Sequence, residues 1–341
     1  MGLKKYIAIR SVHALVTLFG ISILIFFLSR IMPGDPAAAA LGEEAKPEQI
    51  AKLRKEMGLD QPIFVQYFIF LGNLLFKGEL GLSSLTYRDA LKDVSQYFAP
   101  TFELVTASMA LALLAGIPLG ILASQRRDKW LDHFIRLFTI SGVSMPRFWT
   151  AVLLQLVVAY GLGMLPVTGR LERGVPVPTH ITGLFIVDSL ITGNFTAFVG
   201  SVRSLILPAI TLALSPMAAI CRYVRGSMLD ESTKDYVFFA RANGISSKLL
   251  TYRHMLRNAI SPVLTQSSLT FAYLLGNAFE VEVMFSWPGQ ASYAQLAAVT
   301  KDVNAIVAVT LIIGIFYLVI NLFVDLGYGY LDPRARVAEK A

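Results

Sequence analysis

Six long stretches of uncharged, mostly apolar residues recur along the chain, separated by segments that carry charge. A helix needs about 20 apolar residues to cross about 30 Å of hydrocarbon. The stretches show no alternation of apolar and polar positions, which a membrane β-barrel would require. They therefore predict an all-α polytopic membrane protein with about six transmembrane helices, within residues 10–30, 103–126, 147–170, 203–222, 257–280 and 302–325.

A seventh apolar stretch, residues 183–202, is interrupted by Asp188, Gly193 and Asn194. With the N-terminus inside, six spans place seventeen of the thirty Lys and Arg residues in the cytoplasm. A seventh span would move the most basic loop outward, although cytoplasmic loops carry the excess of positive charge. We therefore expect residues 183–202 to be a re-entrant or interfacial segment, and both termini to be cytoplasmic.

Residues 32–97 form a polar segment after the first predicted span. The segment opens with the turn-rich MPGDP, and its apolar residues 61–76 are too few to cross a bilayer. We expect a small extracytoplasmic subdomain with a helix packed on the outer face of the membrane. The predicted division is an N-terminal transmembrane helix (1–31), the extracytoplasmic subdomain (32–97), a core of five transmembrane helices (98–328) with a basic cytoplasmic loop (226–258), and a cytoplasmic tail (329–341).

Composition supports a membrane protein surrounded by lipid. The 341 residues are 55% hydrophobic and 16% charged, with a mean hydropathy of +0.59, whereas soluble domains carry about 25% charged residues. This argues against a soluble enzyme and against nucleic acid as a partner. The net charge of +7 reports orientation in the membrane, and the single Cys221 excludes an intrachain disulfide.

Catalytic and metal-binding motifs are absent from the sequence. There is no Gly-Lys dipeptide for a Walker A phosphate loop, no HExxH zinc motif and no GxSxG nucleophile elbow. We therefore expect no catalytic residue, no metal site and no cofactor bound by this chain.

Small residues recur every four positions in the second predicted span, at Ala112, Gly116 and Gly120. Such residues share one helix face and let two helices approach closely. They predict either a seam along which helices slide during transport or ordinary packing within a bundle.

Three charged residues lie at the ends of predicted spans. Arg147 follows Pro146, which is expected to start the third span at its cytoplasmic end, so Arg147 either serves a translocation path or extends to the lipid head groups. Glu280 and Glu282 follow the fifth span and either line a path or mark the water boundary. Because they are two residues apart, they point to different sides of a helix.

The basic loop contains a short predicted helix that starts near Asp235. Ala240 and Gly244 are spaced to share one face, Ala242 keeps the neighbouring surface small, and Gly244 can cap the helix end. Such a helix either inserts into a groove of a partner or lies on anionic lipid through Arg241 and Lys248.

Several motifs in this order resemble those of the dipeptide/oligopeptide/nickel-type permeases of binding-protein-dependent ABC importers, in their first-permease branch. The motifs are MPGDP, GLDQPIFVQY, GELGLS, VSMPRFW, LPAITLAL, RYVRGSMLDESTKDYVFFARANGIS, RHMLRNAISPVLT, VEVMFSWPGQ and NLFVDLGYGYLDPRAR, and they cover nearly the whole chain. The sequence departs from the family pattern at Asn243, where lysine is common, and at Phe238 and Phe239, which replace a more polar pair.

The resemblance implies a type I (MetI-like) ABC importer permease fold in the cell membrane. It also implies a homologous second permease subunit, two separate ATPase subunits that bind ATP and Mg²⁺, and an extracytoplasmic solute-binding protein. By this resemblance Asp235, Ala240, Arg241, Ala242 and Gly244 form the coupling helix that inserts into an ATPase groove.

The function implied is import of di- or oligopeptides by alternating access, in which ATPase closure moves the permeases as rigid bodies. Oligosaccharides, nickel chelates and glutathione are alternative cargoes within the same family. A stand-alone secondary transporter would need ionisable residues near the middle of the membrane, and the predicted spans contain almost none.

Overall fold

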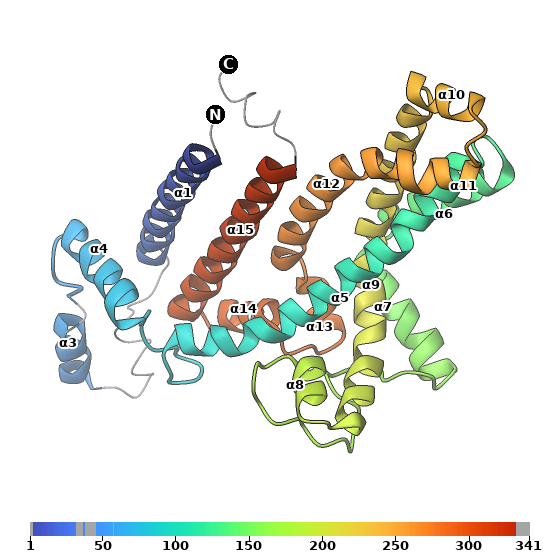
Figure 1. Cartoon of the computed structure of the whole chain (residues 1–341). Coiled ribbons are helices and arrows are strands. Elements are labelled where there is room, and N and C mark those ends of the chain that lie inside the picture. The colour runs from blue at the N-terminus through green and yellow to red at the C-terminus, as the bar shows by residue number, and fades with distance from the viewer. Residues whose placement is uncertain (1–2, 32–36, 38–45, 57, 332–341) are drawn as a thin grey trace. The chain divides into compact units, whose positions relative to one another are not determined.

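The computed structural model describes residues 3–31, 37, 46–56 and 58–331, and almost all of its regular structure is helical (Figure 1). The described residues contain no β-strand, only a single antiparallel bridge between Leu82 and Asp89. The MPGDP motif and the end of the predicted tail lie outside the described residues. The helices, with π-helical segments marked η, are α1 (Leu3–Ile31), α3 (Pro47–Glu56), α4 (Ile63–Gly72), η1 (Asn73–Lys77), α5 (Ala90–Gln125), α6 (Trp130–Ser144), α7 (Arg147–Leu154), η2 (Gln155–Gly161), α8 (Phe185–Ile191), α9 (Phe195–Ser232), α10 (Asp235–Ala242), α11 (Ser247–Leu249), η3 (Leu250–Met255), α12 (Leu256–Gly276), α13 (Phe279–Met284), α14 (Gln290–Val299) and α15 (Val303–Leu331).

Helices occupy all six windows predicted from the sequence, but not all of them are simple spans. Within the described residues, four helices are long and apolar enough to cross a membrane: Ile7–Phe27, Ala90–Gln125, Phe195–Ser232 and Val303–Leu322. A fifth is added only if α6 and the helix Arg147–Gly161, which meet at an angle of 105°, count as one broken span. The third predicted span, within residues 147–170, therefore crosses only together with α6, and the described residues hold four or five candidate spans where the sequence predicted about six.

The remaining departures have local causes. The third helix stops at Gly161, because Gly163, Pro166 and Gly169 follow it closely and favour turns. In the fifth window α12 has 21 residues, enough for a span, but residues such as Gln266 and Ser267 make it more polar than the four candidates. As the sequence predicted, residues 183–202 hold no span of their own, because α8 has only seven residues and α9 starts at Phe195.

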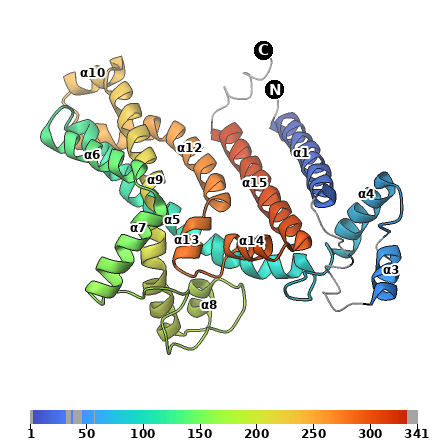
Figure 2. The ribbon, with the colours of Figure 1, turned by 180° about the vertical axis from the view of Figure 1, so that it is seen from behind.

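The described residues form two compact units, which differ from the linear division expected from the sequence. The first unit comprises the described residues within 1–101 and 288–341, and so contains the first and the last described helices, α1 and α15. Helices α1 and α15 run side by side in it (Figures 1 and 2). Its core is apolar and includes Ile25, Leu80, Val94, Ala305 and Leu311.

Polar contacts join the loop before α5 to the start of α15 within this first unit. The Ser83 hydroxyl donates to the Asp302 carboxylate at 2.5 Å, and Asp302 also accepts from the backbone of Ala305 in the first turn of α15. The Tyr97 and Tyr293 rings stack with centroids 4.5 Å apart. Burial raises the pKa of the Tyr293 hydroxyl to about 12.

The second unit, residues 102–287, is built around the long helix α9. This helix packs against α12, α6 and α8, and its inward face is apolar, with residues such as Leu212 and Ile220 almost fully buried. The short helices α8 and α10 lie at opposite ends of α9 (Figure 1). The basic loop that contains α10 therefore connects α9 directly to α12.

Candidate functional site

Helix α10 is the best-defined element of the basic loop, and its start and end follow from the local sequence. Asp235 begins the helix, where a carboxylate favours the positive end of the helix dipole. At the other end the Ile245 amide donates to the Ala240 carbonyl, and the Gly244 amide donates to the Arg241 carbonyl. This is a Schellman motif, which needs the left-handed conformation that Gly244 adopts, with φ +76°. The predicted glycine cap is confirmed.

The two faces of α10 differ in exposure. Val237 and Ala240 are buried against the chain, with 1% and 8% of their surface exposed, whereas Phe238 and Phe239 are 79% and 70% exposed. Arg241 and Asp235 are also exposed. The outward face of α10 is therefore aromatic with a charged border, a composition suited to a partner's groove.

Two details of the predicted coupling residues need correction. Ala240 and Gly244 do not share a helix face, because α10 ends at Ala242 and Gly244 has left-handed backbone geometry. Ala240 lies on the inner face of α10, so its small side chain serves packing inside the chain. The residues of the predicted set that remain accessible are Asp235, Arg241, Ala242 and Gly244.

A hydrogen-bonded cluster fixes α10 to the two long helices that flank it. Tyr236 of α10 donates its hydroxyl to the Glu231 carboxylate of α9 at 2.5 Å. The amide of Asn258, on α12, donates to Glu231 at 3.5 Å and to the Tyr236 hydroxyl at 3.3 Å. Lys234 pairs with the same carboxylate, which is only 9% exposed. Burial and the Glu231 carboxylate together raise the pKa of Tyr236.

This cluster, Glu231 with Lys234, Tyr236 and Asn258, lets a displacement of α10 act on α9 and α12 together. The sequence does not predict this cluster, because its members are spread over 28 positions. The available signal was the position of Glu231 and Tyr236 on either side of the start of a predicted partner-binding helix.

The small-residue seam lies against α9. A Cβ atom added to Gly120 would lie 2.6 Å from the Val224 Cβ and 2.7 Å from the Cys221 carbonyl oxygen. One added to Gly116 would lie 2.9 Å from the Met217 carbonyl. Ala112, the third member, is fully buried. The backbones of α5 and α9 thus approach closely at these glycines, which suits both a sliding seam and static packing.

Arg147 binds the end of a helix rather than lipid head groups near the basic loop. Pro146 caps the start of α7, as predicted, and the Arg147 guanidinium donates to the Asn277 carbonyl at 3.0 Å. Asn277 closes α12 at the end away from the basic loop, and α12 is about 32 Å long at 1.5 Å per residue. The placement of Arg147 on the same side as the basic loop is therefore wrong. Its charge instead complements a helix C-terminus.

Glu280 and Glu282 lie on different sides of α13, as their spacing predicts. Glu280 is exposed, whereas Glu282 is completely buried. The side chain of Gln155 holds this segment by donating to the Met284 carbonyl at 2.9 Å. Only Glu280 of this pair is therefore accessible to an aqueous path in the structure.

A buried ion pair organises the loop between η2 and α8. Arg170 donates two hydrogen bonds to one oxygen of Glu103, at 3.0 and 2.6 Å, and one to the Gly183 carbonyl at 2.6 Å. Its guanidinium also lies 3.7 Å from the centroid of the Phe185 ring. The other Glu103 oxygen accepts the Ile186 amide at 2.8 Å. Burial lowers the pKa of Arg170, although Glu103 opposes the change.

A second buried carboxylate holds the same loop. Asp188 accepts hydrogen bonds from the amides of Ile181, Thr182 and Gly183 and from the Thr182 hydroxyl. Burial alone would raise the pKa of Asp188, but these donors hold it below its usual value. The loop is therefore an ordered cap on the end of α9 opposite α10.

A third buried carboxylate, Asp132, lies near the other end of α9. Arg225 of α9 binds Asp132 of α6 through two parallel hydrogen bonds of 2.8 and 2.7 Å, and Asp132 is fully buried. The sequence predicts neither this pair nor the pair of Glu103 and Arg170. Glu103 is the one charged residue between Asp93 and Arg126, and an isolated charge in an apolar sequence implies a partner.

Comparison with known proteins gives matches along nearly the whole chain. The family model described as binding-protein-dependent transport system inner membrane component matches residues 116–337. The model for the N-terminal region of such membrane components matches residues 3–85. Together these two matches include most of both structural units and leave out residues 86–115 between them.

Individual relatives are similar over most of their length. The chain is 37% identical to the probable D,D-dipeptide transport system permease protein DdpB of Escherichia coli K12, over 92% of each chain. It is 38% identical to the dipeptide transport system permease protein DppB of Alkalihalophilus pseudofirmus, over 94% of this chain and 95% of the relative. The glutathione transport system permease protein GsiC of Escherichia coli O6:H1 is 32% identical, over 97% of this chain and 99% of that protein.

Proposed function

Because the chain belongs to the family of binding-protein-dependent transport system inner membrane components, we propose that it forms half of the translocation path of an ATP-driven importer for di- or oligopeptides. Family membership makes the chain a multi-pass permease subunit of the inner membrane with a type I, MetI-like fold, as expected from the sequence. It is not an enzyme, since separate ATPase subunits hydrolyse ATP in such importers.

The peptide cargo is supported by the names of the relatives. The permeases from Escherichia coli and Alkalihalophilus pseudofirmus belong to dipeptide systems, and the less similar GsiC belongs to a glutathione system. Glutathione is itself a modified tripeptide, so it is the natural competitor to test beside dipeptides.

The proposed assembly contains this chain, a homologous second permease subunit, two ATPase subunits and an extracytoplasmic solute-binding protein in the lipid bilayer. ATP and Mg²⁺ bind the ATPase subunits, and this chain binds no cofactor. Both termini are cytoplasmic, which the distribution of Lys and Arg supports, with seventeen of thirty on that side.

The single observation that carries the proposal is the attachment of α10 to both α9 and α12 through Glu231, Tyr236 and Asn258. The exposed Phe238 and Phe239 face of α10 occupies an ATPase groove. Closure of the ATPase subunits moves α10, and the cluster transmits the motion to the transmembrane helices as a rigid-body rotation.

Gly244→Trp tests this coupling in the complete importer reconstituted in proteoliposomes. Gly174→Trp is the matched control, since both glycines have positive φ, +76° and +85°, and neither has an atom within 4 Å of an added Cβ. We expect Gly244→Trp to abolish dipeptide uptake while ATP hydrolysis and membrane insertion continue, and Gly174→Trp to transport. Normal uptake by Gly244→Trp would contradict the proposal.

A further inference from the structure

The short helix formed by α4 and η1 has an exposed apolar face that the transport function does not explain. No charged residue occurs between Asp60 and Lys77. Phe64 and Phe68 are 74% and 69% exposed, and Leu75 and Phe76 are 67% and 89% exposed. In water such a face would be an unusually large apolar patch for so short a segment.

Contacts with α1 place this helix beside a membrane span. The Tyr67 hydroxyl of α4 shares a 2.8 Å hydrogen bond with the Ser22 hydroxyl of α1. The Tyr67 ring packs edge-on against Phe19 and Phe26, at centroid distances of 6.1 and 5.4 Å, and Phe70 lies 5.6 Å from Phe26.

These contacts lie within the apolar part of α1. The candidate span ends at Phe27. At a rise of 1.5 Å per residue, Ser22 is about 8 Å and Phe19 about 12 Å inside that end. A helix in contact with both residues is therefore at the depth of the lipid acyl chains.

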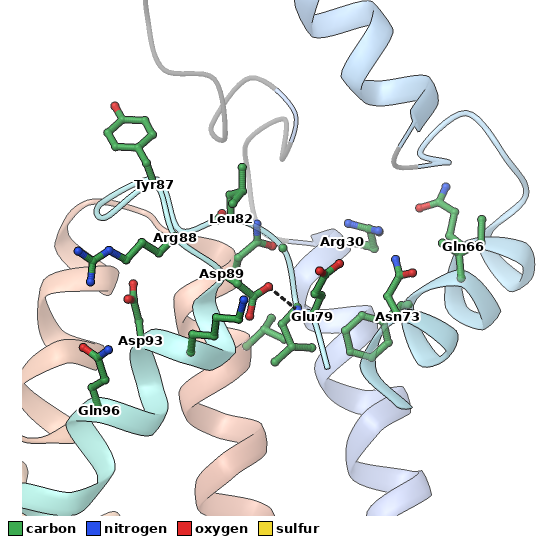
Figure 3. Close-up of a pocket in the computed structure, with 17 residues that line it drawn as sticks. Arg30, Gln66, Asn73, Glu79, Leu82, Tyr87, Arg88, Asp89, Asp93 and Gln96 are labelled. Carbon is green, nitrogen blue, oxygen red and sulfur yellow. Dashed lines mark hydrogen bonds between the residues drawn. The ribbon is translucent and has the colours of Figure 1, made fainter. Parts of the chain in front are cut away.

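The polar side chains of the same helix face the opposite way. Gln66 and Asn73 line a cavity of about 680 Å³, together with Arg30 at the end of α1 and the charged residues Glu79 and Lys92 (Figure 3). In a helix with 100° per residue, Gln66 lies about 200° from both Phe64 and Phe68. The helix therefore turns its polar face to a charged cavity and its aromatic face outward.

We propose that α4 and η1 are embedded in the membrane leaflet that surrounds the C-terminal half of α1, with lipid acyl chains covering Phe64 and Phe68. The exposed face continues an apolar surface already present on the span, since Phe19 contacts Tyr67 and is itself 52% exposed, and Leu15 is 65% exposed. The hydrogen bond between Tyr67 and Ser22 satisfies both hydroxyls inside the protein, as a low-dielectric environment requires. Lys77 ends the segment and can extend its ammonium to the head groups.

This placement revises the role of residues 61–76. The sequence predicted a helix packed on the outer face of the membrane, whereas the contacts with Ser22 and Phe19 require partial immersion. The inference concerns the bilayer and not the cargo, so it stands whether or not the importer carries peptides.

Nitroxide accessibility in lipid nanodiscs tests the inference on the complete importer. Cys221, a buried free cysteine, is replaced by Ser, other reactive cysteines of the complex are removed, and single labels are attached at Phe68→Cys or Phe64→Cys. Accessibility to oxygen, which partitions into lipid, is compared with accessibility to a water-soluble nickel chelate. Leu15→Cys in α1 provides the lipid reference, and the exposed Gln49→Cys in α3 provides the water reference.

The inference predicts an oxygen-to-nickel ratio at Phe68→Cys and Phe64→Cys several-fold above that at Gln49→Cys and close to that at Leu15→Cys. Gln66→Cys, which faces the cavity, should be nickel-accessible. Nickel accessibility at both phenylalanine positions would overturn the inference in favour of an aqueous face. Protection from both reagents would overturn it in favour of a protein partner, such as the solute-binding protein or the second permease.

Discussion

The hydroxyl of Tyr236 on α10 donates a 2.5 Å hydrogen bond to the carboxylate of Glu231 at the end of α9. This contact joins α10, with eight residues, to α9, with 38 residues. Asn258 extends the contact to α12, and we therefore expect the three elements to move together when α10 is displaced. A partner that binds only eight residues of α10 can thereby act on the membrane helices.

Tyr236→Phe removes the hydroxyl and leaves the ring in place. A hydrogen bond to a charged group contributes about 1.5–3 kcal/mol to the stability of the contact that it makes. Its loss weakens the attachment of α10 to α9, so we expect fewer dipeptides to be imported per ATP hydrolysed in proteoliposomes. Tyr223→Phe, on α9 with a ring 45% exposed, is the control and should transport normally. An unchanged transport ratio in Tyr236→Phe would show that the cluster does not carry the coupling.

Phe238→Ala removes an aromatic side chain from the outward face of α10. Buried aromatic anchors at interfaces typically contribute about 2 kcal/mol or more to binding, so we expect a higher dissociation constant between the ATPase subunits and the purified permease. The comparison variant is Phe195→Ala, because Phe195 is 73% exposed but lies at the opposite end of α9. Equal retention of ATPase by both variants would place the interface elsewhere.

Gly120→Ala adds a methyl group where α5 meets α9. Overpacking of a tight contact destabilises by about 1–3 kcal/mol, and the added Cβ would lie 2.6 Å from Val224. We expect a lower midpoint of thermal unfolding for the purified complex. Gly226→Ala serves as the reference, since its added Cβ meets nothing within 4 Å. Equal unfolding temperatures for the two variants would show that α5 and α9 are not in close contact at Gly120 in the folded complex.

Glu103→Gln leaves the buried Arg170 without its counter-charge. Breaking a buried ion pair costs about 3–5 kcal/mol, whereas replacing both partners is often tolerated. We therefore expect Glu103→Gln to lower the unfolding temperature more than the double variant Glu103→Gln with Arg170→Met does. Additive losses in the double-mutant cycle would mean that the two residues stabilise the loop independently.

Sequence patterns predicted the positions of the helices better than their bends and their contacts with one another. Uncharged windows located every long helix, and Pro146 and Gly244 correctly marked a helix start and a helix end, because proline and glycine act locally. Pro146 also accounts for a break between α6 and α7. The size of the bend, 105°, and the hydrogen bond from Arg147 to Asn277, 130 positions further along the chain, have no local sequence pattern that predicts them.

The predicted coupling helix was also located correctly, whereas its contacts with the rest of the chain were not predicted. A basic loop with a short helix could be recognised from local sequence, but the inward orientation of Ala240 depends on packing against the rest of the loop and α9. The pairs Glu103–Arg170 and Asp132–Arg225 join residues far apart in sequence. The sequence assigns no partner to any of these four residues, because neutralisation by a distant partner leaves no local pattern.

Uptake of a labelled dipeptide into proteoliposomes tests the central claim most directly. The complete importer, with its ATPase subunits and solute-binding protein, is compared with vesicles that contain this chain without the ATPase subunits. The permease account predicts accumulation only when the ATPase subunits, the binding protein and ATP are all present. Dipeptide transport by this chain without the ATPase subunits would contradict the account and identify a stand-alone transporter.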